Sequence, residues 1–245
     1  MKKYVVIGNG TAAVGCIEGI RSVDGEGRIT VVSGESRHVY CRPLISYYLE
    51  GKTDLERMKY RPDDFYAENG CEVLYGVKAT AIDCGAKTVA LDNGESLSYN
   101  ELCVAAGSSP FVPPMKGLET VEKKFGFMTL DDTLELEKAI TPDSRVLIVG
   151  AGLIGLKCAE GICGRVAGIT VCDLADRVLS SILDNASAAV VQRKLEENGL
   201  LATDADKIDG EPRVIYFESG TEVTDSQKLK TIEMLNDRFA IMEML

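Results

Sequence analysis

The sequence lacks several features that would assign it to common functional classes. No apolar run approaches the roughly 20 residues that a membrane-spanning helix needs. The opening stretch MKKYVVIGNG breaks at glycines before it can form the core of a signal peptide. Basic residues are in the minority, with a formal net charge of −11, which argues against binding to a nucleic-acid backbone. We therefore expect a cytoplasmic protein that binds neither membranes nor nucleic acid.

Histidine and paired cysteine motifs are also scarce. His38 is the only histidine, and we interpret it as a loop residue rather than an acid or base. The eight cysteines contain no CxxC pair and no zinc-ligand spacing, so we predict no metal site. Cys158 and Cys163 have a C-x4-C spacing, but side chains five residues apart on a helix diverge. Most cysteines are therefore interpreted as small buried hydrophobic residues.

The most informative feature that is present lies near the amino terminus. The run YVVI, two glycines and apolar residues at helical spacing predict a strand, a tight turn and a helix. Gly8 permits the sharp turn, Gly10 removes the side chain that would keep a pyrophosphate away, and Ala13 lets the helix lie close to the strand. The first helical amides, at Thr11 and Ala12, then face an anion. Alone, such a turn is weak evidence, because many proteins use glycine turns and bind nothing.

The same pattern occurs a second time, which makes a purely structural origin harder to defend. The stretch RVLIVGAGLIGLKCAEGI again predicts strand, turn and helix, now with the full G-x-G-x-x-G spacing. Its glycines are Gly150, Gly152 and Gly155, and Leu153 and Ile154 supply the first helical amides. We therefore predict two dinucleotide-binding turns in one chain of 245 residues.

Each copy is followed by a second β-rich run that ends near an acid. Glu35 lies 25 residues beyond Gly10, and Asp173 lies 18 beyond Gly155, close to the spacing of about 20 expected of a ribose-binding carboxylate. Such a carboxylate repels a 2′-phosphate, so Asp173 favours NAD(H) over NADP(H), although Arg177 nearby leaves this open. The alternative is that both acids are solvated residues at strand ends.

The region between the two copies is rich in short strands. The runs CEVLY, VKATAID, KTVALDN and ELCVAAG predict a β-meander, and CRPLISYYLEGK predicts a loop with a short helix. The proline-rich stretch SSPFVPPMKG predicts an extended crossover into a second domain. A helix in TLDDTLELEKAI, starting at Thr or Asp, precedes the second turn. We predict an FAD-binding domain over residues 1–110 and an NAD(H)-binding domain over residues 111–245.

Four motifs together resemble one known family. GNGTAA, VYCRPLISYYLEGK, YNELCVAAGSSP and GAGLIGLKCAEGI are similar, in order and spacing, to motifs of FAD/NAD(P)H-dependent pyridine nucleotide-disulfide oxidoreductases. The nearest branch contains rubredoxin and ferredoxin reductases and the flavin portion of nitrite reductases. The resemblance covers residues 1 to about 200. It implies an α/β fold with two Rossmann-like domains, each a three-layer arrangement with a parallel sheet and a β-meander.

The resemblance also implies a site. The FAD contacts would be Gly8, Gly10, Thr11, Ala12, Ala13, Glu35, Arg42, Pro43, Val77, Ala105, Ala106 and Gly107. The NAD(H) contacts would be Gly150, Gly152, Leu153, Ile154, Gly155 and Asp173. Within the FAD set, Glu35 binds the adenosine ribose, Val77 brackets adenine through its backbone, and Arg42 with Pro43 lies beside the flavin. Arg42 has an alternative reading as a surface cation, and Cys41 is expected to pack beside the flavin rather than act as a redox thiol.

The function implied is transfer of a hydride from NADH to FAD and of electrons onward to an acceptor, such as a rubredoxin or ferredoxin. Cofactor positioning suffices for this chemistry, so no catalytic side chain is assigned. One alternative is a truncated, non-catalytic dinucleotide-binding fragment or sensor. Another is a structural α/β protein whose glycines only turn corners. The oligomeric state is left open.

The sequence departs from the family pattern in three places. Lys157 stands where many relatives have a glutamate near the nicotinamide, and Ala106 replaces the usual threonine. Beyond about residue 200 the resemblance fades, and we expect the FAD domain to be incomplete at its carboxyl end. The stretch GTEVTDSQKLKTIEML in this atypical tail predicts a helix instead.

Overall fold

The computed structural model describes residues 1–109, 112, 118–173, 175 and 177–197, and the backbone of Arg213–Tyr216 and Phe239–Met242. The chain forms two compact units. Unit 1 contains Met1–Cys41 and Leu55–Ser109, and unit 2 contains Arg42–Asp54 and Pro110–Leu245. Residues 42–54, which we predicted to lie in the first domain, belong to unit 2. Which cofactor each unit binds stays a prediction at this point.

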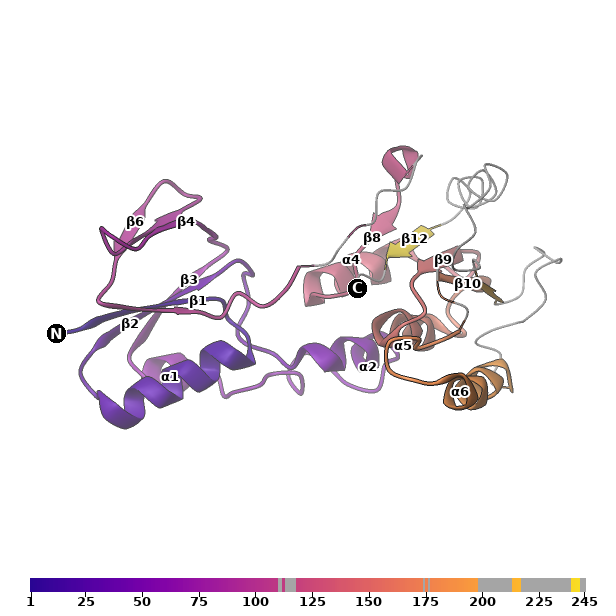
Figure 1. Cartoon of the computed structure of the whole chain (residues 1–245), viewed down its shortest axis with the longest axis horizontal. Coiled ribbons are helices and arrows are strands. Elements are labelled where there is room, and N and C mark those ends of the chain that lie inside the picture. The colour runs from indigo at the N-terminus through magenta and orange to yellow at the C-terminus, as the bar shows by residue number, and fades with distance from the viewer. Residues whose placement is uncertain are drawn as a thin grey trace. The chain divides into compact units, whose positions relative to one another are not determined.

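Unit 1 is built on a parallel sheet with the strand order β3-β2-β1-β7. Its strands are β1 (Lys3–Ile7), β2 (Arg28–Ser33), β3 (Cys71–Tyr75) and β7 (Glu101–Val104). Helix α1 (Thr11–Val23) lies on one face, and a small antiparallel sheet lies on the other (Figure 1). The parallel sheet is therefore covered on both faces, as parallel sheets generally are.

The antiparallel sheet is a three-stranded meander, narrower than the sequence predicted. It contains β4 (Ala79–Asp83), β5 (Thr88–Leu91) and β6 (Ser96–Ser98). The runs CEVLY and ELCVAAG, which we assigned to the meander, instead form β3 and β7 at the two edges of the parallel sheet. Short apolar strands look alike in sequence, and their partners are chosen by tertiary packing, so this part of the prediction was wrong.

Side chains of β1 alternate between two hydrophobic clusters, as the period of two of a strand requires. Val6 packs on the α1 side, whereas Val5 and Ile7 pack toward the meander, against Val89 and Leu91. The cluster on the α1 side also contains Ala13, Val14, Ile17, Ile29, Val31, Val39, Phe65 and Tyr66. Phe65 and Tyr66 come from the short helix α3 (Phe65–Glu68). This packing anchors β1 and α1, which flank the first glycine turn.

Unit 2 contains a parallel sheet with the order β11-β10-β9-β12-β8. Its strands are β8 (Lys124–Phe125), β9 (Arg145–Val149), β10 (Gly168–Asp173), β11 (Arg213–Tyr216) and β12 (Phe239–Met242). Its helices are η1 (Arg42–Leu44), α2 (Ile45–Leu49), η2 (Leu118–Thr120), α4 (Leu130–Ala139), α5 (Leu153–Ile162) and α6 (Asn185–Glu197). Within the described residues, none of the helices has both the length and the apolar character needed to cross a bilayer.

The start of α4 matches its sequence signal. Thr129 is the N-cap, and its hydroxyl accepts a 3.1 Å hydrogen bond from the Asp132 N–H, while Asp132 accepts a return bond of 2.8 Å from the Thr129 N–H. This capping box satisfies two backbone donors that the helix itself leaves unpaired. The helix predicted in the tail and most of the proline-rich crossover lie outside the described residues.

Candidate functional site

The first glycine turn requires glycine at its first position. Gly8 follows β1 with φ of +110°, and its N–H donates a 2.8 Å hydrogen bond to the carbonyl of Val32 on β2. A Cβ at Gly8 would lie only 2.0 Å from the carbonyl oxygen of Ala105, which follows β7. The turn is thus fixed by close approach of three strand ends, and any side chain would break it.

Gly10 has a different role, because its surroundings are open. It is the N-cap of α1 and makes no side-chain cap hydrogen bond. A Cβ built there meets no described atom within 4 Å. Thr11 and Ala12 are exposed, whereas Ala13 is fully buried and holds α1 against the sheet. The helix start therefore presents its amides to open space, as a pyrophosphate site requires.

Asn9, between the two glycines, was missed by the sequence analysis. Its amide Nδ2 donates to the carbonyl of Arg37 at 3.1 Å, and its Oδ1 accepts a hydrogen bond from the hydroxyl of Tyr66. Burial raises the pKa of Tyr66, so the phenol stays protonated and able to donate. The ring of His38, in the loop after β2, packs edge-on against Tyr66 at 5.0 Å between centroids. The sequence signal that could have pointed to Asn9 is the presence of a polar residue between the two glycines of the turn.

Glu35 lies in the loop that follows β2, near the same turn. Its carboxylate Oε2 accepts a 2.7 Å hydrogen bond from the hydroxyl of Tyr40, and its backbone carbonyl accepts one of 2.7 Å from the hydroxyl of Ser33. The N–H of Val77 donates to the Ser33 carbonyl at 3.0 Å. Val77 is thus beside Glu35. Because the Val77 N–H is already bonded to Ser33, the backbone contact with adenine that we predicted would have to use the Val77 carbonyl.

The segment after β7 lies against the first turn and then becomes exposed. The Ala105 N–H donates to the Ile7 carbonyl at 2.7 Å, which continues the pairing of β7 with β1. Ala106 and Gly107 are exposed, and Gly107 has φ of +72° with open space around it. These three residues therefore lie at the carboxyl edge of the sheet, where nucleotides bind in folds of this kind.

Arg42 and Pro43, the predicted flavin-side contact, are part of unit 2. They form η1 directly before α2, and both side chains are exposed. The Arg42 Nη1 donates to the carbonyl of Met128 at 3.1 Å, which is also in unit 2. The predicted FAD contacts are therefore distributed over both units, with Cys41 at the end of the unit 1 segment and its N–H bonded to the Met58 carbonyl at 2.8 Å.

The second glycine turn repeats the geometry of the first. Gly150 follows β9 with φ of +115°, and its N–H donates a 2.7 Å hydrogen bond to the carbonyl of Cys172 on β10. Gly152 is the N-cap of α5 and makes no side-chain cap hydrogen bond, while Gly155 is buried in the first turn. Leu153 and Ile154 are 58% and 36% exposed, so the start of α5 is accessible to a ligand.

Asp173 is bound to the second turn itself. Its Oδ2 accepts a 2.6 Å hydrogen bond from the Ala151 N–H, and its Oδ1 accepts one of 2.7 Å from the Ala175 N–H. Each carboxylate oxygen has a further lone pair available for a ribose hydroxyl. Arg177 donates from Nε to the Leu183 carbonyl and from Nη2 to the Ser180 carbonyl, both at 3.2 Å, and so holds the following turn.

Both turns thus have the features that a dinucleotide needs: a helix start without a side-chain cap, an acid at or just beyond the end of the second strand, and accessible residues in the first helical turn. Within the described residues, no cluster of three or more histidine, cysteine or acidic side chains is arranged to hold a metal ion.

Comparison with known proteins assigns the family. The model of the pyridine nucleotide-disulphide oxidoreductases matches residues 2–232. The chain belongs to this family. That result confirms the resemblance drawn from the four sequence motifs, but the match continues past residue 200, where we expected the resemblance to fade. Proteins of the family bind FAD and NAD(H), as we predicted.

Individual members of the family are similar over most of this chain. Subunit epsilon of the NADH-dependent phenylglyoxylate dehydrogenase of Aromatoleum evansii is 34% identical over 80% of this chain and 47% of its own length. Rubredoxin-NAD(+) reductase of Pseudomonas putida is 29% identical over 80% of this chain and 51% of its own length. The chain therefore spans about half the length of these family members.

A solved structure with a similar fold confirms the α/β fold class. The covalent complex of putidaredoxin reductase with putidaredoxin matches 99% of this chain and 58% of its own, with a TM-score of 0.77 and 24% identity. At this identity the likeness shows the fold alone. The individual cofactor contacts named above stay predictions for this member of the family.

Proposed function

We propose that this chain binds FAD at the turn of residues 8–10 and NAD(H) at the turn of residues 150–155, and acts as an NADH-dependent oxidoreductase. The observation that carries the proposal is the repeated turn. Gly8 and Gly150 have φ of +110° and +115°, their N–H groups bond to the neighbouring strand at 2.8 and 2.7 Å, and a helix without a side-chain cap follows each. When bound, FAD would accept a hydride from NADH and pass the electrons to an acceptor.

The chain itself contributes binding and orientation. The amides at the starts of α1 and α5 hold the two pyrophosphates, where the positive ends of the helix dipoles favour negative charge. Glu35 and Asp173 accept hydrogen bonds from the ribose hydroxyls, and their own partners, Tyr40 and Ala151, keep the carboxylates in place. We assign no acid or base, because hydride transfer between stacked rings needs position rather than proton transfer.

The second site is proposed to prefer NADH to NADPH. Asp173 carries the negative charge that a 2′-phosphate would meet. Arg177, the cation that left the preference open, has its Nε and Nη2 donors bonded to the carbonyls of Leu183 and Ser180. Drawing that guanidinium to a 2′-phosphate would break these bonds, so the arrangement supports NADH as the donor.

A small redox protein, such as a rubredoxin or a ferredoxin, is the proposed acceptor. Support comes from the names of relatives, which include rubredoxin-NAD(+) reductase and putidaredoxin reductase of Pseudomonas putida. A cytoplasmic location is proposed as well, since all eight cysteines are free thiols, which suits a reducing compartment.

The decisive experiment measures flavin and NADH use together. The purified protein is incubated with FAD and desalted, and its absorption spectrum is recorded before and after NADH under anaerobic conditions, followed by NADH oxidation with ferricyanide. We expect bound flavin whose absorbance bleaches with NADH. Gly10→Ala places a methyl group where the pyrophosphate would lie, so this variant should lose flavin. Gly19→Ala places a methyl group in open space further along α1, so this control should keep its flavin.

Three outcomes separate the alternatives. Flavin binding with bleaching by NADH supports the proposal. Binding of NADH without any uptake of FAD would replace it with a non-catalytic dinucleotide-binding fragment or sensor. If neither FAD nor NADH binds at saturating concentrations, the result would favour the alternative of a structural α/β protein, in which the glycines only permit tight turns.

A further inference from the structure

Two thiols of unit 1 are in direct contact. We expected most cysteines to be buried hydrophobic residues, but only Cys158 and Cys172 are buried. Cys16 on α1 and Cys103 on β7 are both partly buried, and a hydrogen bond joins their side chains. The two sulfurs are therefore neighbours before any oxidation, which is the first requirement for a disulfide.

The fold explains why these two side chains meet. Along β7, Leu102 packs toward the meander, whereas Cys103, in register with Val6 of β1, packs toward α1. On α1, Cys16 packs against the same hydrophobic cluster, next to the fully buried Ile17. Cys16 and Cys103 are thus brought together between one helix and one strand of the same unit.

The pair lies at the margin of the core rather than inside it. β7 is the last strand in the order β3-β2-β1-β7 of the described residues, so Cys103 has sheet neighbours on one side only. Cys71 lies on β3 at the opposite edge, three strand spacings of about 4.8 Å away. Its thiol donates to the Asn69 carbonyl at 3.5 Å. A small oxidant can therefore reach the pair, and Cys71 is too distant to compete for either sulfur.

The surroundings of Cys16 decide how a disulfide at this place would behave. Burial, followed by the hydrogen bond with Cys103, raises the pKa of Cys16 to about 11. A thiol with a raised pKa is a poor leaving group, so a disulfide that contains Cys16 is broken slowly by other thiols. The thiol also reacts slowly at neutral pH, because little of it is thiolate. Such a pair suits a response to sustained oxidation rather than rapid catalytic turnover.

We propose that Cys16 and Cys103 form a thiol–disulfide site, at which a small-molecule disulfide such as oxidised glutathione oxidises the pair and so links α1 to β7. One protein thiol loses its proton to solvent and attacks the small disulfide, which gives a mixed disulfide and releases one small thiolate. The second protein thiol then loses its proton and attacks the protein sulfur of the mixed disulfide. The Sγ–Sγ bond forms, and the second small thiolate leaves. Two electrons pass to the small disulfide, and its two thiolates take up two protons from solvent.

The cross-link should hold the first glycine turn from both sides. α1 begins directly after the turn, and β7 leads into Ala105, whose carbonyl oxygen lies against Gly8. Linking Cys16 to Cys103 closes a loop of roughly 90 residues, which removes much of the conformational freedom of the unfolded chain. Unit 1 should therefore resist unfolding better under oxidising conditions. The site needs neither nucleotide, so the inference is independent of the proposed function.

The test uses the full chain with its two exposed thiols removed by Cys84→Ser and Cys163→Ser, which prevents links between molecules. The protein is treated with excess oxidised glutathione and desalted, its remaining thiols are alkylated, and unreduced proteolytic peptides are identified by mass spectrometry. We expect a peptide containing Cys16 joined to one containing Cys103, and two fewer alkylated thiols. The melting temperature should rise by about 5–10 °C, and dithiothreitol should reverse the rise.

Cys16→Ala and Cys103→Ala, each made in the same background, should lose both the linked peptide and the rise in melting temperature. Cys71→Ala is the matched control, because it removes a partly buried thiol that packs against the same cluster, and it should keep both. The inference is overturned if oxidation gives no link, only glutathione adducts, or a link from either residue to another cysteine. A link between Cys16 and Cys103 without a rise in melting temperature also overturns it. The peptide map needs no alanine variant, so the test stays decisive if one of them does not fold.

Discussion

The carboxylate of Asp173 and the backbone N–H of Ala151 are joined by a hydrogen bond of 2.6 Å. Ala151 lies between Gly150 and Gly152, so the acid at the end of β10 also fixes the turn that follows β9. A residue expected only to meet a ribose therefore holds the shape of the pyrophosphate site as well. Its replacement should affect both the fold of the turn and the binding of the nucleotide.

Asp173→Asn is expected to weaken NAD(H) binding about tenfold or more and to lower the free energy of unfolding by about 1–2 kcal/mol. An amide has one acceptor oxygen, so it can serve the N–H of Ala151 or of Ala175 but not both. Fluorescence titration and urea unfolding measure the two effects. Asp184→Asn removes an acid that accepts from the Ser187 N–H at the start of α6, and this control should cost stability alone. Unchanged NADH affinity in Asp173→Asn would contradict the assigned role.

Gly8→Ala and Gly10→Ala should fail in different ways. Gly8 has a positive φ and no room for a methyl group beside Ala105, so its substitution should lower the free energy of unfolding by roughly 3 kcal/mol or more. Gly10 has ordinary backbone angles and open surroundings, so its substitution should leave the melting temperature nearly unchanged while flavin binding is lost. Thermal unfolding and flavin absorbance distinguish them. A strongly destabilised Gly10→Ala would show that the open space is needed for folding instead.

Arg165→Met should loosen the segment that contains α2. It removes the hydrogen bond to the Leu49 carbonyl and the contact with Glu137, which also accepts a 3.2 Å bond from the Tyr48 hydroxyl. The pair is about one third exposed, so we expect a loss of about 1–2 kcal/mol, mostly from the buried carbonyl left unpaired. Hydrogen exchange should increase at residues 45–50. Lys194→Met, which breaks an exposed pair, should change stability by less than about 0.5 kcal/mol.

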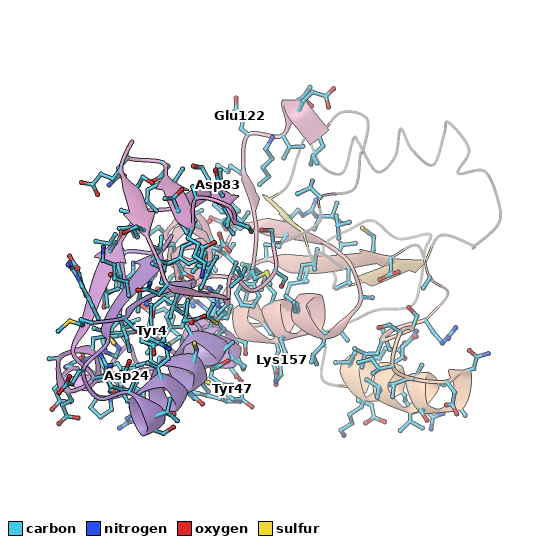
Figure 2. The ribbon with its side chains drawn as sticks, turned by 60° about the vertical axis from the view of Figure 1, so that its left-hand side comes forward. Tyr4, Asp24, Tyr47, Asp83, Glu122 and Lys157 are labelled. Atoms are coloured by element: carbon cyan, nitrogen blue, oxygen red, sulfur yellow. The ribbon has the colours of Figure 1, made fainter. Side chains whose placement is uncertain are left out.

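Asp24 should make unit 1 sensitive to acid. Its carboxylate accepts hydrogen bonds from the N–H groups of Gly27 and Glu26 and from the Tyr4 hydroxyl at 2.9 Å (Figure 2), and these lower the pKa of Asp24 below its ordinary value. A lowered pKa in the folded state stabilises the protein above the unfolded value of about 3.9, and this stabilisation disappears as the pH falls through the folded value.

We therefore expect Asp24→Asn to reduce the fall in melting temperature between about pH 5 and pH 2, although its stability at neutral pH is lower than that of the wild type. Tyr4→Phe, which removes one of the three donors, should give an intermediate slope. Melting temperatures measured across this pH range test the assignment. An Asp24→Asn variant with the wild-type slope would show that other carboxylates control the acid response.

Much of the fold could be predicted because its turns need particular residues. The positive φ of Gly8 and Gly150 and the capping box of Thr129 depend on chemistry within a few residues, so their sequence signals are local. Partners of short strands are not local. β3 and β7 have the same apolar character as the meander strands, and only tertiary pairing, of β3 with β2 and of β7 with β1, places them in the parallel sheet.

The parts of the site that the sequence could not supply depend on distant partners. Asn9 is held by Tyr66 and by the Arg37 carbonyl, and nothing in the local pattern connects these residues. Likewise, the contact of Cys16 with Cys103 joins two positions that are far apart in the chain. The identities of such residues are visible in the sequence, but their proximity is a result of folding.

The membership of Arg42–Asp54 in unit 2 has a practical consequence for dissecting the protein. A truncated protein ending at residue 110 would retain α2 without α5, leaving Leu49, which is fully buried in the intact chain, with its apolar surface in water. Such a fragment should aggregate for a reason unrelated to its nucleotide turn. Joining residue 41 to residue 55 through a short glycine linker would give a first unit without this exposed apolar surface. Attaching residues 42–54 to the second unit would preserve the contact between α2 and α5.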